Sequence, residues 1–248
     1  TLGFSFNMAD LVFPAFFFAL LLIYSKKRRY VGDFIFGIAF MFFAISTLGA
    51  TGKEMDLSHN QSVIDFFSSF DKDSYATIFS FLGIGTVLTF CMQSSAALMA
   101  ITMVLCSSGV LPIYMGIALV LGENIGTTIT SNIAAMGANT QARRAALAHL
   151  TFNVFGVIWV LCIFYPFIDM VCDFVGVDPH ADHIDATRLS VVLAAFHTTF
   201  NVCNTSILIW LIPQMERFVC YIIKPSAKKD EDDFRLRYIG GTAIMKTP

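Results

Sequence analysis

The chain has 248 residues, of which 56% are hydrophobic and 14% are charged, and its mean hydropathy is +0.69. Water-soluble domains carry about a quarter of their residues as charges, so this composition excludes an ordinary soluble enzyme and a disordered chain. The formal net charge of −2 offers no overall attraction for nucleic acid. We therefore expect a helical protein that crosses a membrane several times, with lipid as its surroundings and no nucleic-acid partner.

The first half of the chain opens with two apolar stretches. Residues 1–25 are apolar apart from Asp10 and end against the basic cluster 26–29, and residues 34–50 form the second stretch. The polar segment 51–74, expected to be a loop, is mainly acidic. Because basic loops stay on the cytoplasmic side, the basic cluster is predicted inside and the acidic loop outside.

The same rule orients the second half. Residues 145–168 are expected to cross outward and residues 189–212 to cross back, with an acidic loop between them and a basic tail in the cytoplasm. These assignments predict a multi-pass protein of the plasma membrane, the inner membrane of a bacterium. Residues 1–223 then form the membrane domain, and residues 224–248 form a cytoplasmic linker.

Residues 74–142 carry one charge between Asp73 and Arg143, yet they must make an odd number of crossings. Tyr75–Met92 would be about 27 Å long as a helix, but Ser95–Cys106 only about 18 Å. Two unequal arms around the polar residues Gln93, Ser94 and Ser95 predict a re-entrant hairpin that enters the membrane and returns. A helix beginning at Ser94 or Ser95 would direct free N–H groups at an anion.

A second polar element divides the next apolar stretch. Residues 122–128 read G-E-N-I-G-T-T, and two glycines within five residues favour an unwound bridge between two half-helices. We expect one broken transmembrane helix here, with a second half-helix starting near Thr127. Irregular backbone at this depth requires protein or a polar cavity around it, so the hairpin tip and the bridge predict a binding site.

The residue types favour an anion that is transported together with a cation. The region offers hydroxyl and amide groups but no Lys or Arg, so a phosphate dianion would need a positive ion that travels with it. Ser94, Ser95, Thr127 and Thr128 are the candidate phosphate donors. Gln93, Asn124 and Thr130 are candidates to orient the tip or to bind sodium, since small hard cations prefer oxygen ligands.

Further candidates support or couple the site. Glu123 is the lone carboxylate at membrane depth, which marks it as a functional candidate or as a partner of His149. The motif H-x-T-F-N-V occurs twice, 48 residues apart, and places His149 with Asn153, and His197 with Asn201, on one helical face each. These four residues form either a proton relay or hydrogen bonds between helices.

The sequence contains no motif for several common kinds of binding site or catalytic site. The six cysteines include no C-x-x-C pair spaced as in a zinc site, and no nucleotide-binding loop or Ser/His/Asp arrangement occurs. We expect no enzyme, no organic cofactor and no metal other than sodium as co-substrate.

The residues quoted so far resemble a known family. The segments TFCMQSSAALMAITMVL and LGENIGTTITSNIAAMGANTQARRAALAHLTFNVFGV closely resemble the bacterial branch of the type II sodium/phosphate cotransporter family. The resemblance extends over residues 1–223 and is richest in motifs over 85–156. It implies sodium-driven transport of inorganic phosphate, with hairpin tips and broken helices around the substrate.

This sequence departs from the family pattern in two ways. The third Ser of the family's Q-S-S-S tip is Ala96 here. Members of the family also carry two such repeats in opposite orientation, whereas this sequence contains one. The resemblance therefore implies a chain that holds the second repeat, with the first repeat as its missing partner and a PhoU-like soluble domain after the linker. A homodimer would be another way to complete the site.

The sequence leads us to an all-α, polytopic membrane helix bundle with a re-entrant hairpin and a broken helix, acting in sodium-coupled phosphate symport. Two alternatives remain open. One is a transporter of another small anion, or one that uses protons, with Glu123 or His149 as the carrier. The other is a membrane receptor that senses phosphate and signals without net flux.

Overall fold

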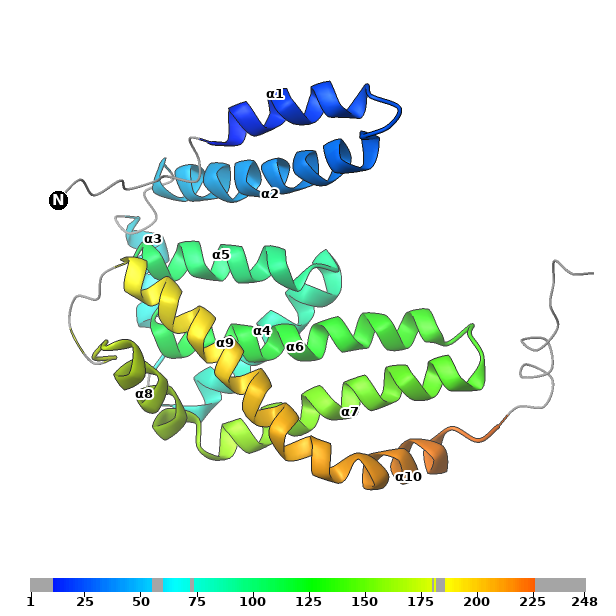
Figure 1. Cartoon of the computed structure of the whole chain (residues 1–248). Helices are drawn as coiled ribbons and strands as arrows, with labels where there is room; N and C mark the ends of the chain where they lie inside the picture. Colours follow the sequence, from blue (N-terminus) through cyan, green and yellow to red (C-terminus); the bar gives the residue numbers. More distant parts are fainter. Residues whose placement is uncertain (1–10, 55–59, 72–73, 180, 182–185, 226–248) are drawn as a thin grey trace, which may run out of the picture.

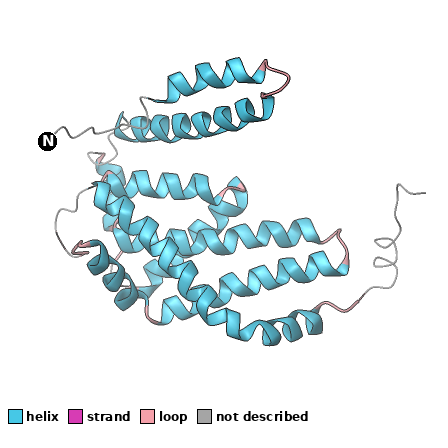
Figure 2. Cartoon of the chain, viewed as in Figure 1, coloured by secondary structure: helices cyan, strands magenta, loops and turns pink. Residues whose placement is uncertain are grey.

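The computed structural model describes residues 11–54, 60–71, 74–179, 181 and 186–225, and all regular structure within these ranges is helical (Figures 1 and 2). The elements in chain order are α1 (Val12–Ile23), α2 (Arg29–Glu54), α3 (Gln61–Ser68), α4 (Tyr75–Met92), α5 (Ser95–Ser107), α6 (Ile113–Ala135), α7 (Thr140–Cys162), α8 (Phe164–Val175), α9 (Ala186–Leu208), the short 3-10 turn η3 (Ile209–Leu211) and α10 (Ile212–Ile222).

Five segments of the described chain are long and apolar enough to cross a membrane. They are Arg29–Leu48, Tyr75–Met92, Ile113–Ala135, Thr140–Cys162 and Arg188–Ile222. Helices α1 and α5 are apolar but shorter, with 12 and 13 residues. The prediction of an all-α, multi-pass membrane protein is confirmed.

Helix α6 is the central helix of the bundle. Its first half is buried on every side, from Ile113 through Glu123. Helices α4, α5, α7 and α9 all contact it, and α9 crosses the bundle diagonally (Figure 1). A helix surrounded in this way needs no polar face, which is why its apolar residues show no helical stripe.

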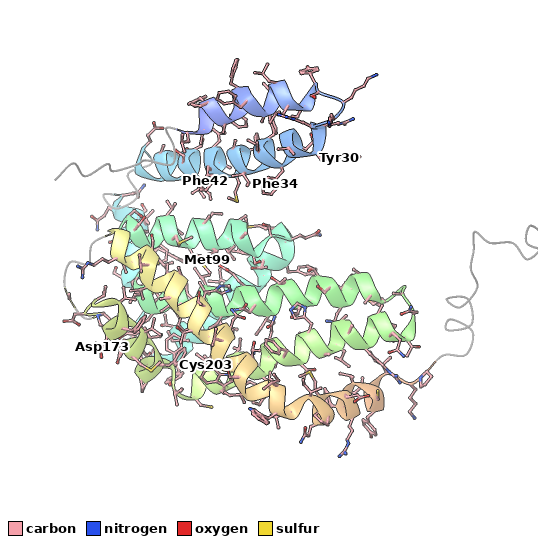
Figure 3. The ribbon with its side chains drawn as sticks, in the orientation of Figure 1. Tyr30, Phe34, Phe42, Met99, Asp173 and Cys203 are labelled. Atoms are coloured by element: carbon pink, nitrogen blue, oxygen red, sulfur yellow. The ribbon has the colours of Figure 1, made fainter. Side chains whose placement is uncertain are left out.

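Helices α1 and α2 form an antiparallel pair beside the bundle (Figure 1). The ring of Phe16 contacts Phe36, Phe40 and Phe43 across the pair, at centroid distances of 5.1 to 6.3 Å. The pair reaches the rest of the protein through contacts between α2 and α5, and Figure 3 marks Phe42 on α2 and Met99 on α5 along these two helices. Many aromatic side chains of the pair are exposed, as expected where lipid replaces water.

The segment 51–74, predicted to be a loop, is partly helical. Helix α2 continues to Glu54, and α3 follows with Asn60 as its N-cap, whose side chain accepts from the N–H of Ser62. Phe67 and Phe70 pack their rings against Phe81 of α4. The cap and this aromatic contact outweigh the polar composition that favoured a loop.

The apolar stretch 145–168 is divided between two helices. Helix α7 ends at Cys162 and α8 begins at Phe164, because Ile163 leaves the helical conformation with φ −128° and ψ 35°. Pro166 lies in the first turn of α8, where a missing N–H costs nothing. Helix α8 then packs against α9, so the chain turns back at this point.

Candidate functional site

The turn between two helices that was predicted around Gln93 is present, and the re-entry of this hairpin into the membrane stays a prediction. Helix α4 ends at Met92, and Gln93 follows in the left-handed conformation with φ 54° and ψ 24°, which reverses the chain within two residues. Ser94 is the N-cap of α5, and its hydroxyl accepts from the N–H of Ala97 at 3.3 Å. Gln93 is exposed, whereas Ser94 and Ser95 are half-buried. We call Gln93, Ser94 and Ser95 the hairpin tip.

The unwound bridge predicted at residues 122–128 is wrong. Helix α6 is continuous through all seven residues. The glycines instead allow α4 to approach closely: a Cβ on Gly122 would collide with the backbone oxygen of Leu82, and one on Gly126 would lie 2.6 Å from the backbone oxygen of Thr86. Thr86 also donates to the oxygen of Gly122 at 3.2 Å. Small residues serve here as a helix-packing surface.

A continuous α6 also removes the second helix start that was predicted near Thr127. The hydroxyls of Thr127, Thr128 and Thr130 donate to the backbone oxygens of Glu123, Ile125 and Thr127, at 2.9, 2.7 and 2.7 Å. The side chain of Asn124 donates to the oxygen of Val120 at 3.1 Å. Thr128 is fully buried and the other three residues are half-buried. In this arrangement each hydroxyl proton is used within α6, and the oxygen lone pairs remain as acceptors.

The hairpin tip lies beside the second half of α6. The Cβ of Thr89 and the N of Phe90 lie 2.7 and 3.3 Å from the place that a Cβ on Gly126 would take. The tip begins one turn beyond Thr89, so it lies at the level of the threonines that follow Gly126. No hydrogen bond between described residues joins the tip side chains to α6. The structure therefore brings the two sequence motifs to the same level of the bundle without joining them.

Glu123 lies on α6 with its side chain buried. Its exposed fraction is 3%, and its Oε1 atom has no hydrogen-bond partner among the described residues. The expected partner His149 is exposed on α7 and does not contact it by any hydrogen bond or ion pair. The buried side chain of Thr102 on α5 lies beside the Glu123 carboxylate. No sequence pattern indicated this neighbour.

The two copies of the H-x-T-F-N-V motif lie in α7 and α9 and act differently. Asn153 is buried and donates to the backbone oxygen of Asn124 on α6 at 2.8 Å. Asn201, the matching residue, donates to the oxygen of His197 within its own helix at 2.8 Å. His197 is half-buried. The first copy thus holds α7 against the glycine motif of α6, and the second makes no such bridge.

Asn204 provides the bridge between α7 and α9. It is fully buried, donates to the backbone oxygen of Phe152 at 3.0 Å and accepts from the indole N–H of Trp159 at 3.2 Å. Asn204 follows the second copy of the repeated motif by two residues, and no sequence pattern indicated its partners on α7.

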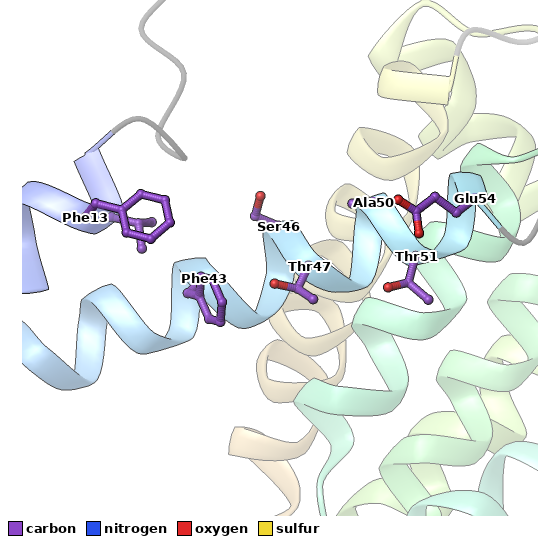
Figure 4. Close-up of a pocket in the computed structure, with 8 residues that line it drawn as sticks. Phe13, Phe43, Ser46, Thr47, Ala50, Thr51 and Glu54 are labelled. Carbon is purple, nitrogen blue, oxygen red and sulfur yellow. The ribbon is translucent and has the colours of Figure 1, made fainter.

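Cavities occur away from the hairpin tip. One of about 440 Å³ lies between α1 and α2, where Ser46, Thr47 and Thr51 line one side of α2 (Figure 4). Two others, of about 360 and 430 Å³, lie against α7 and α10. None of these three is lined by a residue of the tip.

A family model described as Na+/Pi-cotransporter matches residues 61–168, which include the hairpin, all of α6 and all of α7. Among curated proteins, YqeW of Bacillus subtilis (strain 168) is 30% identical over 158 residues, covering 62% of this chain and 48% of YqeW. YjbB of Escherichia coli (strain K12), whose name proposes export of inorganic phosphate, is 25% identical over 147 residues, 59% of this chain and 25% of YjbB.

A mammalian relative matches the same region. Sodium-dependent phosphate transport protein 2B of Bos taurus is 28% identical over 137 residues, which is 53% of this chain and 20% of that protein. The chain thus spans about half, or less, of the length of the curated relatives it matches. No solved structure matches it. The matched segment, residues 61–168, carries both sequence motifs and is similar to the Na+/Pi-cotransporter family.

Proposed function

We propose that the full-length protein transports inorganic phosphate across a membrane together with sodium, and that this chain supplies one half of the transport pathway. The membrane domain would be residues 1–223, with residues 224–248 linking it to a soluble region. The names of two groups of relatives support phosphate as the substrate, and those of the mammalian relatives support sodium as the co-substrate.

The observation that carries this proposal is the start of α5. Helix α5 has 13 residues, about 20 Å, which is too short to cross a membrane. Its N-terminus therefore lies at depth when its other end is at the surface. The cap by Ser94 satisfies the N–H of Ala97, while the N–H groups of Ser95 and Ala96 have no acceptor within the helix. Such a helix start suits an oxyanion.

The hydrogen-bonding groups of the neighbouring residues suggest different positions for phosphate and for sodium. Phosphate oxygens need donors, which the N–H groups and hydroxyls of Ser94 and Ser95 can provide. Thr127 and Thr130 have their hydroxyl protons bound within α6, so they present lone pairs that suit a cation. We therefore place phosphate at the start of α5 and sodium between the tip, including Gln93, and these threonines. Thr128 is fully buried, so we give it a supporting role, and the exposed amide of Gln93 closes the site.

The charge balance argues for a co-transported cation. Helices α4, α5 and α6 contain a single charged residue, Glu123, and it is acidic. A phosphate dianion placed among these helices would be opposed by low dielectric and by this carboxylate. Sodium ions bound at the same time reduce the net charge that must cross.

The test is uptake of labelled phosphate into proteoliposomes that contain the full-length protein, under an inward gradient of sodium or of potassium. We expect sodium-specific accumulation that is lost in Ser94→Ala/Ser95→Ala. The matched control is Ser107→Ala/Ser108→Ala, which removes two hydroxyls at the other end of the same helix, where each donates to a nearby backbone oxygen.

Preloaded vesicles give the direction of transport, because export would appear as sodium-dependent efflux. Absence of phosphate movement in both directions, by a folded parent of known orientation, would overturn the proposal and favour a receptor that binds phosphate without flux. Equal loss in the tip variant and the control would remove the tip from the substrate site.

A further inference from the structure

The end of α6, the start of α7 and the end of α10 lie at the same end of the bundle and line a cavity of about 360 Å³ (Figure 1). We call this cavity the α10 groove. Most of its lining is apolar, and Ile133, Met136 and Ile222 are more than half exposed. Along α7 the lining extends from Arg143 to Leu150, which is about 10 Å. An open apolar groove on a membrane protein marks a place where lipid or another chain binds.

Two polar side chains line the α10 groove, and one of them has no partner. The amide nitrogen of Asn132 donates to the backbone oxygens of Thr128 and Ala146 at 2.8 and 2.9 Å, so both of its protons are used. The guanidinium of Arg143 is half-buried and makes no hydrogen bond or ion pair within the described part of the chain. A guanidinium matches two oxygens of a phosphate group, so Arg143 gives the groove a place for an anion.

The next residue, Arg144, is used in a different way. Its guanidinium donates twice to the backbone oxygen of Ile223, at 3.0 and 2.9 Å, and this holds the end of α10 against α7. Arg144 lines the neighbouring cavity of about 430 Å³ together with Glu216, so that lining contains charges of both signs. The α10 groove, by contrast, has a positive charge and no acidic residue in its lining. The two cavities beside α10 therefore differ in the ligand charge that they favour.

The residues around α10 are those of a membrane surface. Trp210, just before α10, and Tyr221 near its end are strongly exposed, as is typical of aromatic side chains at the level of the lipid headgroups. Lys224 is exposed and directly follows the lining residue Ile223, so it adds a second positive charge near the groove. The arginines at 143–144 predict that this end of the bundle is cytoplasmic, the side on which anionic lipids gather.

We propose that the α10 groove binds one anionic phospholipid, with its phosphate group on Arg143 and an acyl chain between α6, α7 and α10. The lipid neutralises the guanidinium and covers apolar side chains that the described helices leave open. A zwitterionic lipid would bring a positive group of its own toward Arg143 and Lys224, so a headgroup with net negative charge is favoured. Binding of this lipid does not depend on any transport activity, and the inference therefore stands apart from the proposed function.

The experiment measures binding of fluorescent phosphatidylglycerol to the purified full-length protein in detergent. We expect saturable binding that unlabelled phosphatidylglycerol displaces, whereas phosphatidylcholine with the same acyl chains and inorganic phosphate do not. Arg143→Gln is expected to raise the dissociation constant about tenfold, because one charge-assisted contact is lost. Leu147→Trp fills the groove one turn beyond Arg143 without a change of charge, and is expected to weaken binding by a similar factor. Either variant serves alone if the other does not fold.

The matched control is Arg217→Gln, which removes one exposed positive charge of α10 that lines neither cavity. Equal weakening by Arg143→Gln and Arg217→Gln would indicate general attraction to the membrane surface and overturn the proposal, as would unchanged binding in Leu147→Trp or equal affinity for phosphatidylcholine.

The acidic residues 230–233 of the same chain are the competing occupant. They are neutralised in the full-length protein by Asp230→Asn/Glu231→Gln/Asp232→Asn/Asp233→Asn. Phosphatidylglycerol binding that is absent in the parent and present in this variant would assign the groove to that segment and overturn the lipid site. Binding of equal strength in both proteins supports the lipid.

Discussion

The side-chain amide of Asn153 donates to the backbone oxygen of Asn124, 29 positions earlier in the chain, at 2.8 Å. This hydrogen bond fixes α7 against α6 at the centre of the G-E-N-I-G-T-T motif. Asn124 itself uses its side chain to bond the oxygen of Val120 within α6. The motif is therefore held from α7 on one side, while its two glycines receive α4 on another.

The two copies of the repeated motif provide a matched pair for testing this contact. We expect Asn153→Ala to lower the free energy of unfolding by about 0.6 to 1.7 kcal/mol, the range of hydrogen bonds between membrane helices. Asn201→Ala is expected to have a much smaller effect, since Asn201 bonds only within α9. Unfolding in mixed detergent measures both values, and equal losses would contradict the assigned bridge.

The glycines of α6 predict a steric effect. Gly122→Ala places a methyl group against the backbone of Leu82, which cannot move independently of α4. We expect a loss of about 1 to 3 kcal/mol in the free energy of unfolding, as in other overpacked interfaces.

Gly83→Ala on α4 is the control, because a Cβ there meets no atom within 4 Å. This change is expected to be neutral or stabilising by up to about 1 kcal/mol, through helix propensity. Tolerance of Gly122→Ala would indicate that α4 and α6 are further apart than described.

The hairpin could be predicted from the sequence because its signals are local. The polar residues 93–95 stand between two apolar runs of unequal length, and the structure places α4 over Tyr75–Met92 and the start of α5 at Ser95, as expected. A left-handed residue and a serine cap act within one turn of the chain. Their effect needs no knowledge of distant partners.

The glycine motif could not be interpreted in the same way. Glycine serves equally well where a helix unwinds and where another helix packs closely, and only the partner decides between the two. For Gly122 that partner is Leu82, 40 residues away, whose position no local pattern predicts. The position of Thr102 beside Glu123 was missed for the same reason, since a threonine among apolar residues gives no signal of its own.

We expect the substitution Gln93→Gly to have opposite effects on stability and on transport. A residue with a Cβ loses about 1 to 2 kcal/mol in the left-handed conformation relative to glycine. Gln93→Gly is therefore expected to raise the free energy of unfolding by about 1 kcal/mol, while removing the amide that we propose closes the substrate site.

The converse change provides the control. Gly109 has φ +75° at the end of α5, so Gly109→Ala is expected to lower stability by a similar amount without affecting phosphate uptake. A Gln93→Gly protein that is more stable and transports phosphate at the parent rate would show that the Gln93 side chain has no part in the site.

The thiol of Cys172 on α8 is expected to react slowly with maleimide. Burial, and secondarily the negative charges of Asp169, Asp173 and Asp178, raise the pKa of this thiol from 9.0 to about 11. At pH 8 the thiolate is then about 100-fold scarcer than for an unperturbed thiol. Maleimide labelling of Cys172 is expected to be at least 100-fold slower than that of an exposed cysteine introduced by Asp173→Cys in a Cys172→Ala background.

The sign of the effect on stability follows from the same shift. Folding favours the neutral thiol, so its contribution to stability is complete below pH 9 and is lost as the pH rises through about 11. Because burial is the larger cause, Asp173→Asn is expected to restore only a small part of the reactivity of Cys172. Comparable labelling of the two cysteines at pH 8, in protein that remains folded, would contradict the buried position of Cys172 between α8 and its neighbours.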